Sequence, residues 1–367
     1  MKSLIISNSL WNIYNFRFRL ISELSKKNDV VVYCNIKKTD KFLKKFPKKV
    51  KIKNLQYSSK SKNIFKNLKL IFFFFKILIK EKPNNLFTFT LKPNLYFGIL
   101  NNFFKINFFP TITGLGTAKN RGGLLLLFIK LLMKFSFKSS SKIIVHNKNE
   151  KKFLINIGFN KNKIIQTNGS GISLSKYKNN SFNSNISNKY LFVGRLIADK
   201  GINELVVAFK KFNKFVNKTS QLTLAIMPDE DNQTSIKVDD IKFKTSNTNI
   251  VLKINTKNIS KVIKDHGCLI LPSYSEGMSR SIMEAITSSR PVICSNIHGC
   301  KEMVINNFNG FLVTPKSSQS IYQALKKFNF LTLRDKKKLG RNSRYLAKKN
   351  RFDEKYVVSE YINLIKQ

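Results

Sequence analysis

The chain has 367 residues, and its 67 Lys and Arg against 20 Asp and Glu give a formal net charge of +47 at pH 7. This length exceeds what one hydrophobic core usually fills, which predicts two domains. The lysines are spread along the whole chain, without a basic arm, a tail or a zinc-finger, bZIP or RNP signature. The charge alone therefore does not predict a protein that binds nucleic acid.

Two interpretations of the charge remain open. Anionic lipid and phosphorylated ligands are candidate partners of a strongly basic protein. Alternatively, the excess of Lys accompanies abundant Asn, Ile and Phe, the residue types that AT-rich codons supply, and reflects genome composition.

The cysteines and the apolar segments indicate the compartment. Cys34, Cys268, Cys294 and Cys300 are spaced too irregularly for a disulfide framework or a metal site, so reduced thiols in the cytoplasm are expected. The apolar stretch at 4–6 is too short for the core of a signal peptide. Since no window approaches the ~18 apolar residues of a spanning helix, we expect a chain that does not cross a membrane.

Short apolar strands alternate with longer segments of helical pattern. Residues 4–7 and 30–34 have the pattern of strands, residues 11–25 that of a helix, and the alternation resumes after Tyr190. This order predicts α/β architecture with parallel sheets and crossover helices. We expect two doubly wound, Rossmann-like domains that face each other across a cleft.

A polar segment separates the two expected domains. Residues 178–189, KNNSFNSNISNK, are rich in Asn and Ser and have no period, which is typical of a linker. The predicted domains are residues 1–177 and 190–349. A C-terminal helix at about residues 350–367 is expected to pack back on the first domain.

Two segments of the first domain combine apolar runs with lysines. In residues 121–138, Lys130, Lys134 and Lys138 are four residues apart, which on a helix places their ammonium groups on one face. Residues 68–80 have a similar composition. Each segment is either a basic amphipathic helix in the headgroup layer of anionic lipid or an ordinary buried helix with a lysine-bearing solvent face.

The strongest chemical signal is residues 269–285, LILPSYSEGMSRSIMEA. The pattern predicts a buried strand, a turn and a helix that begins near Met278 or Ser279. Such a passage directs backbone N–H groups and the positive end of a helix dipole at one place, which suits a phosphate. Glu276 and Glu284 are too far apart for an acid/base couple but can bind opposite ends of one extended ligand, such as a ribose and a hexose.

A second motif, VGRLIADKG at 193–201, also follows a buried strand. Arg195 and Lys200 would lie at the mouth of the same sheet, next to Gly194. A diphosphate needs cations of this kind to neutralise its charge. The two motifs together predict one anion-binding site.

These motifs, followed by SRPVICSNIHGCKEMVINNFNGFLV, resemble the C-terminal domain of the family 4 retaining glycosyltransferases of the GT-B fold. Upstream, TFTLKPNLYFGIL at 88–100, TITGLGTA at 111–118 and NGSGISLSKY at 168–177 are similar to the branch that assembles lipid-linked polysaccharide and glycan precursors. The resemblance covers nearly the whole chain.

The resemblance implies a nucleotide-sugar donor in the second domain. Glu284 would bind the ribose, and Arg195 and Lys200 the diphosphate. Glu276 with the Gly277-Met278 backbone would bind the transferred sugar, so that Glu276, Arg195 and Lys200 are the catalytic residues. The substrate-binding residues implied are Glu284, Gly277, Met278, Ser279, Gly194, Asn8, Ser9, Gly114, Gly116 and Lys92. The departing diphosphate would help deprotonate the acceptor in a front-face displacement, without a metal or any other cofactor.

Several residues depart from the family pattern. The first strand-helix loop, residues 7–17, has no glycine, although the backbone of Asn8 and Ser9 can still approach the donor. A histidine that relatives carry after a middle strand is replaced by Thr90 or Lys92. His298 and Cys300 are read as packing residues rather than as a metal pair.

The function implied is transfer of a hexose or N-acetylhexosamine from a UDP-sugar to a lipid-linked glycan acceptor that the first domain would bind. The expected place is the inner face of a bacterial plasma membrane, in lipopolysaccharide or other cell-envelope polysaccharide synthesis. Lys130, Lys134 and Lys138 would contact the anionic surface, and nucleic acid is not an expected partner. The alternatives are a nucleotide-sugar epimerase of the same fold, a basic nucleic-acid-binding protein and an inactive relative.

Overall fold

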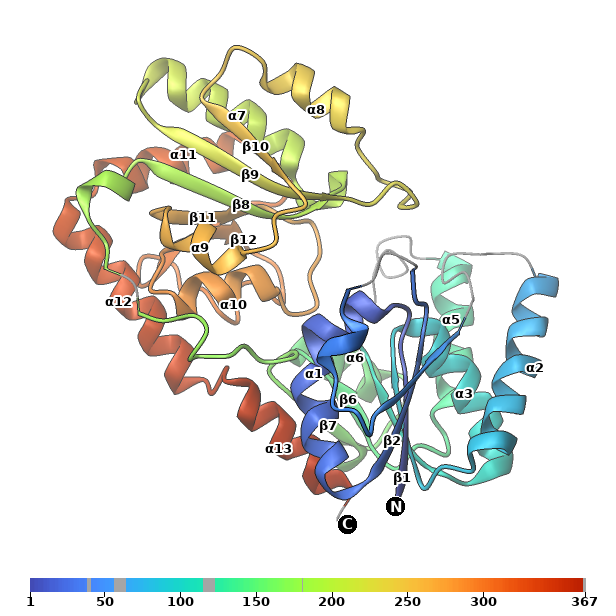
Figure 1. The fold of residues 1–367 in the computed structure, drawn as a ribbon. Coiled ribbons are helices and arrows are strands. Elements are labelled where there is room, and N and C mark those ends of the chain that lie inside the picture. Colours follow the sequence, from blue (N-terminus) through green and yellow to red (C-terminus); the bar gives the residue numbers. More distant parts are fainter. Residues whose placement is uncertain (38–40, 56–63, 115–122, 180, 366–367) are drawn as a thin grey trace. The chain divides into compact units, whose positions relative to one another are not determined.

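The structure is a computed structural model that describes residues 1–37, 41–55, 64–114, 123–179 and 181–365. Contacts divide the chain into two compact units: unit 1 is Met1–Ser170 with Glu354–Gln367, and unit 2 is Gly171–Asp353. Each unit contains one parallel sheet with helices on its faces (Figure 1). The predicted α/β class with two Rossmann-like sheets is confirmed.

Unit 1 contains a seven-stranded sheet in the order β3-β2-β1-β4-β5-β6-β7. Apart from the edge strand β3, its strands are short, apolar and mostly buried, as expected where helices cover both faces of a parallel sheet. The strands are β1 (Lys2–Ile6), β2 (Asp29–Cys34), β3 (Lys51–Asn54), β4 (Asn85–Phe89), β5 (Asn107–Thr111), β6 (Ile143–Val145) and β7 (Ile164–Gln166).

Two hydrophobic clusters lie on the two faces of this sheet. Successive residues of β1 point to opposite faces and so belong to different clusters. Leu4 and Ile6 belong to the cluster that includes residues of α2, α3 and α5, and Ile5 belongs to the cluster that includes residues of α1 and α13. The helices of unit 1 are α1 (Leu10–Lys27), α2 (Ile64–Glu81), α3 (Leu91–Phe104), α5 (Gly123–Ser136), α6 (Lys148–Asn156) and α13 (Glu354–Leu364).

Unit 2 contains a six-stranded sheet in the order β10-β9-β8-β11-β12-β13. The order reverses beside β8, so β8 and β11 are neighbours although two strands separate them in the chain. The strands are β8 (Lys189–Leu196), β9 (Gln221–Pro228), β10 (Ile250–Ile254), β11 (Cys268–Leu271), β12 (Val292–Ser295) and β13 (Gly310–Val313). The helices are α7 (Ile202–Phe215), α8 (Val238–Thr245), α9 (Ile259–Lys264), α10 (Arg280–Thr287), α11 (Ser318–Phe330) and α12 (Leu333–Lys349).

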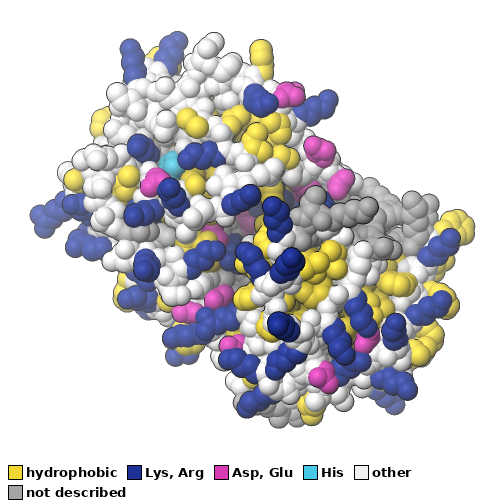
Figure 2. All heavy atoms as spheres, in the orientation of Figure 1, with side chains coloured by type: hydrophobic (Ala, Val, Ile, Leu, Met, Phe, Trp, Pro, Cys, Tyr) yellow, Lys and Arg dark blue, Asp and Glu magenta, His cyan; other side chains and the backbone are white. Residues whose placement is uncertain are grey.

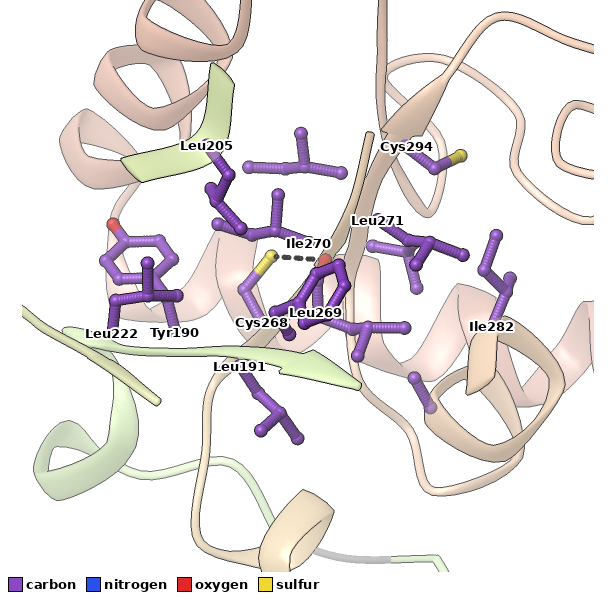
Figure 3. Close-up of a cluster of buried hydrophobic side chains, with 14 of the residues drawn as sticks. Tyr190, Leu191, Leu205, Leu222, Cys268, Leu269, Ile270, Leu271, Ile282 and Cys294 are labelled. Carbon is purple, nitrogen blue, oxygen red and sulfur yellow. Dashed lines mark hydrogen bonds between the residues drawn. The ribbon is translucent and has the colours of Figure 1, made fainter. Parts of the chain in front are cut away.

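One hydrophobic core fills unit 2. Figure 3 shows the side chains around β11, with Leu205 of α7 and Ile282 of α10 among those packed about the strand. The buried Phe182 and Ile186 also join this core, although they lie in the polar segment 178–189. Residues of β8 and β11 pack in this core, and the loops that form the site follow at the carboxyl ends of these strands.

Candidate active site

Two loops of unit 2 are joined at the point where the strand order reverses. The backbone N–H of Tyr274, after β11, donates to the carbonyl of Asp199, after β8, at 2.8 Å. Gly201 has φ +70°, and a Cβ there would lie 2.2 Å from the carbonyl oxygen of Pro272. Glycine is required at this position for both reasons. Ligands of doubly wound sheets bind at such a reversal, beyond the carboxyl ends of the strands.

Lys200 and Glu276 meet between these loops. The Lys200 ammonium pairs with Glu276 Oε1, and the Ser273 hydroxyl donates to the same oxygen at 2.7 Å. The two paired side chains are only 15% and 10% exposed, so water screens their charges less than at an open surface. The structure thus brings together one cation of the first motif and one carboxylate of the second.

A third loop supports the turn that carries Glu276. Gly299, after β12, has φ +83°, and a Cβ there would lie 2.3 Å from the Gly277 carbonyl oxygen and 2.7 Å from that of Glu276. The Ser279 N–H points at the Gly299 carbonyl, 3.5 Å away, just before α10 begins. Sequence reasoning missed Gly299; its one signal was a glycine in the segment IHGC. This loop shapes the turn that includes Gly277, Met278 and Ser279.

Glu284 lies in a second polar cluster, on α10. Its side chain is 9% exposed, and its Oε1 accepts hydrogen bonds from the Tyr177 hydroxyl at 2.7 Å and from Arg280 Nε at 3.1 Å. Burial, together with the Glu284 carboxylate, raises the pKa of Tyr177. Sequence reasoning missed both partners. The i,i+4 spacing of Arg280 and Glu284 on a helix was an available signal, whereas Tyr177, 107 residues away, offered none.

Arg195 does not join the Lys200 cluster. Its side chain is 44% exposed and pairs with Asp229, just after β9, at 2.7 Å. Gly194 lies nearer the cluster, because a Cβ there would be 3.9 Å from Lys200 Cγ and 3.1 Å from the Phe192 ring. The two cations of the motif therefore have different carboxylate partners on different loops.

In unit 1, Asn8 and Ser9 follow β1. Ser9 is the N-cap of α1, since its hydroxyl accepts from the Asn12 N–H at 3.2 Å. The Ser7 hydroxyl donates to Asn12 Oδ1 at 3.1 Å, beside the half-buried Asn8. Gly114 follows β5 with φ +123°, and Gly116 lies outside the described residues.

Thr90 and Lys92 follow β4. Thr90 has φ 79° and ψ 154°, a region that essentially only glycine occupies, and its buried hydroxyl finds no hydrogen-bond partner among the described residues. The Lys92 ammonium donates to Asn67 Oδ1 at 3.1 Å, and burial lowers the pKa of Lys92. Strain of this kind concentrates at functional sites, and no residue pattern could reveal it.

The three lysines expected on one helical face are divided by a helix end. Lys130 and Lys134 lie on α5, which ends at Ser136, and Lys138 lies in the turn that follows. The helix ends there because Phe137 turns into the core and the Ser140 N–H bonds to its carbonyl. Lys138 therefore lies just beyond the helix, and the shared face of the three lysines stays a prediction.

The chain is similar to known proteins, in part of unit 2 and over its whole length. Residues 176–345 match the family model described as "Glycosyl transferases group 1". Over 380 aligned residues, the chain is 25% identical to "N,N'-diacetylbacillosaminyl-diphospho-undecaprenol alpha-1,3-N-acetylgalactosaminyltransferase" of Campylobacter jejuni, with 98% of this chain and 96% of that relative covered.

Two solved structures have the same fold over the whole chain. A sucrose-phosphate synthase from Thermosynechococcus elongatus gives a TM-score of 0.83 at 17% identity, with 100% of this chain and 98% of that one covered. The HepE protein of Anabaena, solved in complex with UDP and glucose, gives 0.77 at 16% identity, with 100% and 99% covered. These likenesses confirm the predicted GT-B fold.

Proposed function

We propose that this chain, a glycosyltransferase of the GT-B fold whose residues 176–345 match the glycosyl transferases group 1 family, moves a hexose or N-acetylhexosamine from a UDP-sugar to a lipid-linked glycan with retention of configuration. The observation that carries the donor site is the meeting of Lys200 and Glu276 between the loops after β8 and β11.

The donor contacts that we propose begin with this pair. Lys200 leaves Glu276 partly or wholly to neutralise the diphosphate, and the Glu276 carboxylate then accepts hydrogen bonds from the sugar hydroxyls. Glu284 binds the ribose hydroxyls from the other end of the turn and helix. Arg195 reaches the diphosphate by exchanging Asp229 for it, which its exposure permits.

The reaction needs no protein carboxylate as nucleophile. The bond from the anomeric carbon to the diphosphate oxygen breaks while a bond to the acceptor oxygen forms on the same face. The acceptor proton passes to the leaving diphosphate, whose charge Lys200 stabilises. No metal ion takes part in this scheme, so activity should persist in excess EDTA.

The acceptor is inferred from a relative. The Campylobacter jejuni protein is named for transfer to a diphospho-undecaprenol-linked sugar, which supports a polyprenyl-linked acceptor here. We place the protein at the inner face of a bacterial plasma membrane, in assembly of lipopolysaccharide or another envelope polysaccharide. Lys130, Lys134 and Lys138 would contact the anionic lipid.

A panel of nucleotide-sugars, incubated with and without a polyprenyl-diphosphate sugar, tests the proposal. We expect UDP release that depends on the acceptor, and a product whose anomeric configuration, read by NMR, matches the donor. Lys200→Ala and Arg195→Ala should both lower kcat. Conversion of the donor to its epimer without acceptor would instead indicate an epimerase.

A further inference from the structure

The outward face of α2 is apolar. Phe65, Leu68, Phe72, Phe75 and Ile79 are between 37% and 77% exposed. At 3.6 residues per turn these five side chains fall within about 80° of arc, so they form one stripe along the helix. We call these five residues the α2 stripe. The opposite face of α2 is also apolar, with Leu70, Phe74, Ile77 and Leu78 packed in the core, so the stripe is not needed to hold α2 on the sheet.

Lysines border the stripe on one side. Lys69, Lys76 and Lys80 are exposed, and the helical period places them within about 60° of the stripe. The Lys76 ammonium lies over the Phe72 ring, 4.6 Å from its centroid. Figure 2 shows dark blue and yellow side chains interleaved at this edge of unit 1. An ammonium group beside an apolar stripe is the arrangement of a helix that lies in a bilayer interface.

Helix α5 repeats this pattern. Its exposed Leu127, Phe128, Leu131 and Phe135 lie next to Lys130 and Lys134 in the helical period. Helix α3 packs against both α2 and α5, and its Phe103 is 79% exposed. Three neighbouring helices of one layer thus expose large apolar side chains, far more than the single exposed residues found on most surfaces.

The charge of this layer decides which partner fits. Along α2, α3 and α5 the one acidic residue is Glu81, which is buried and pairs with Lys2 and Lys53. A second copy of this chain would present the same lysines and be repelled. An anionic bilayer supplies both negative headgroups and an apolar interior. Among the helices that the structure describes, none combines the length and hydropathy that crossing a bilayer requires.

We propose that α2 docks in the plane of an anionic bilayer, with the α2 stripe among the acyl chains and Lys69, Lys76 and Lys80 at the headgroups. This rests on the proposed action at a membrane surface, and it assigns the main anchoring role to α2 rather than to the lysines of α5. Apolar burial gives the anchor its strength, and the lysines give it selectivity for anionic lipid.

A single tryptophan reports the depth of insertion. The chain has one Trp, Trp11 on α1, so Trp11→Phe with Phe72→Trp places the only indole on the α2 stripe. With phosphatidylglycerol vesicles we expect a blue shift of its emission and quenching by lipids brominated in the acyl chains. Phe215→Trp in the same background, at the 66% exposed end of α7 in unit 2, is the matched control and should show neither.

Vesicle pelleting tests the two parts of the surface. Leu68→Ser, Phe72→Ser and Ile79→Ser combined should weaken binding to phosphatidylglycerol vesicles at least about tenfold. The control variant Phe215→Ser, Phe243→Ser, Phe330→Ser removes three side chains of unit 2 that are even more exposed, at 66–82%, and should bind normally. The preference for phosphatidylglycerol over phosphatidylcholine should be lost in the combined variant Lys69→Glu, Lys76→Glu, Lys80→Glu. It should be retained in the control variant Lys210→Glu, Lys214→Glu, Lys218→Glu.

Two outcomes would overturn the proposal. The first is equal vesicle binding by the two serine variants. The second is a blue shift of the Phe72→Trp emission that occurs without vesicles and increases with protein concentration, which would indicate self-association. The vesicle assays need neither donor nor acceptor. Failure of every nucleotide-sugar to react, with vesicle binding intact, would remove the proposed enzymatic function and leave the docking surface. Transfer to a detergent-solubilised acceptor without vesicle binding would remove only the docking surface.

Discussion

In both sheets the strand order reverses beside the first strand of the unit, β1 or β8, but the loops at the two reversals carry different side chains. In unit 2 the loops after β8 and β11 carry a paired ammonium and carboxylate, and glycines allow backbone contacts that no other residue permits. In unit 1 the neutral Ser7 follows β1 and bonds to Asn12 of α1, and β4 is followed by the strained Thr90 and by Lys92, whose ammonium bonds to an amide oxygen instead of a carboxylate. The topology fixes where a ligand binds, and the loops decide whether it is charged.

Among the variants considered, Lys200→Ala should have the largest effect on activity. We expect kcat/KM to fall about 10²–10³-fold, because no ammonium would stabilise the diphosphate as it leaves. Steady-state kinetics with the best donor of the panel measures it. Lys210→Ala, an exposed lysine of α7, should leave the kinetics unchanged. A Lys200→Ala enzyme within threefold of the wild type would contradict the proposed site.

Gly299→Ala should disrupt the packing of the Gly299 loop against the turn that carries Glu276. The new Cβ would meet two carbonyl oxygens, and alanine strains at φ +83°, so we expect a loss of about 2–3 kcal/mol in the unfolding free energy of unit 2. Activity should fall about tenfold as the Glu276 turn shifts. Calorimetry measures the first effect and kinetics the second.

The control for Gly299 is Gly123→Ala. Gly123 has φ +62°, but no atom of the described residues lies within 4 Å of its added Cβ, so that variant isolates the backbone strain from the collision. Equal destabilisation by the two variants would mean that the contact with the Gly277 and Glu276 carbonyls does not matter.

Tyr177→Phe tests the role of the polar cluster around Glu284. Loss of one hydrogen bond to the Glu284 carboxylate should raise the donor KM about tenfold, with kcat retained, because Glu284 would lose its orientation toward the ribose. Titration calorimetry should also show a smaller preference for UDP over 2′-deoxy-UDP. Tyr345→Phe, at an exposed position, serves as the control, and an unchanged preference would contradict a ribose-binding Glu284.

Thr90→Gly tests the strained loop of unit 1 and has the smallest expected effect. Glycine relaxes at φ 79° and ψ 154°, so unit 1 should gain about 1 kcal/mol of stability, while UDP binding to unit 2 stays unchanged. Lys105→Gly, in the ordinary left-handed region at the end of α3, should give a smaller gain. A loss of stability in Thr90→Gly would show that Thr90 is not strained.

Much of the fold was predictable because it depends on local patterns. The alternation of apolar strands and helical segments predicted parallel α/β sheets, and β1, α1 and β2 lie within a few residues of the predicted ranges. The placement of Lys200 and Glu276 after strands followed from the same pattern, whereas Arg195 lies within β8. The end of α5 before Lys138 did not, since it depends on where Phe137 finds space in the core.

The sequence by itself determined the architecture and the loops that carry charged side chains, because strand and helix periods and turn residues act over a few neighbouring positions. Only the tertiary structure decided the partners: Lys200 meets Glu276 across 76 residues, Arg195 meets Asp229 on another loop, and Tyr177 reaches Glu284 across 107. Such pairings depend on how the strands order themselves in the sheet and how closely glycines let the loops approach, and no local pattern contains either.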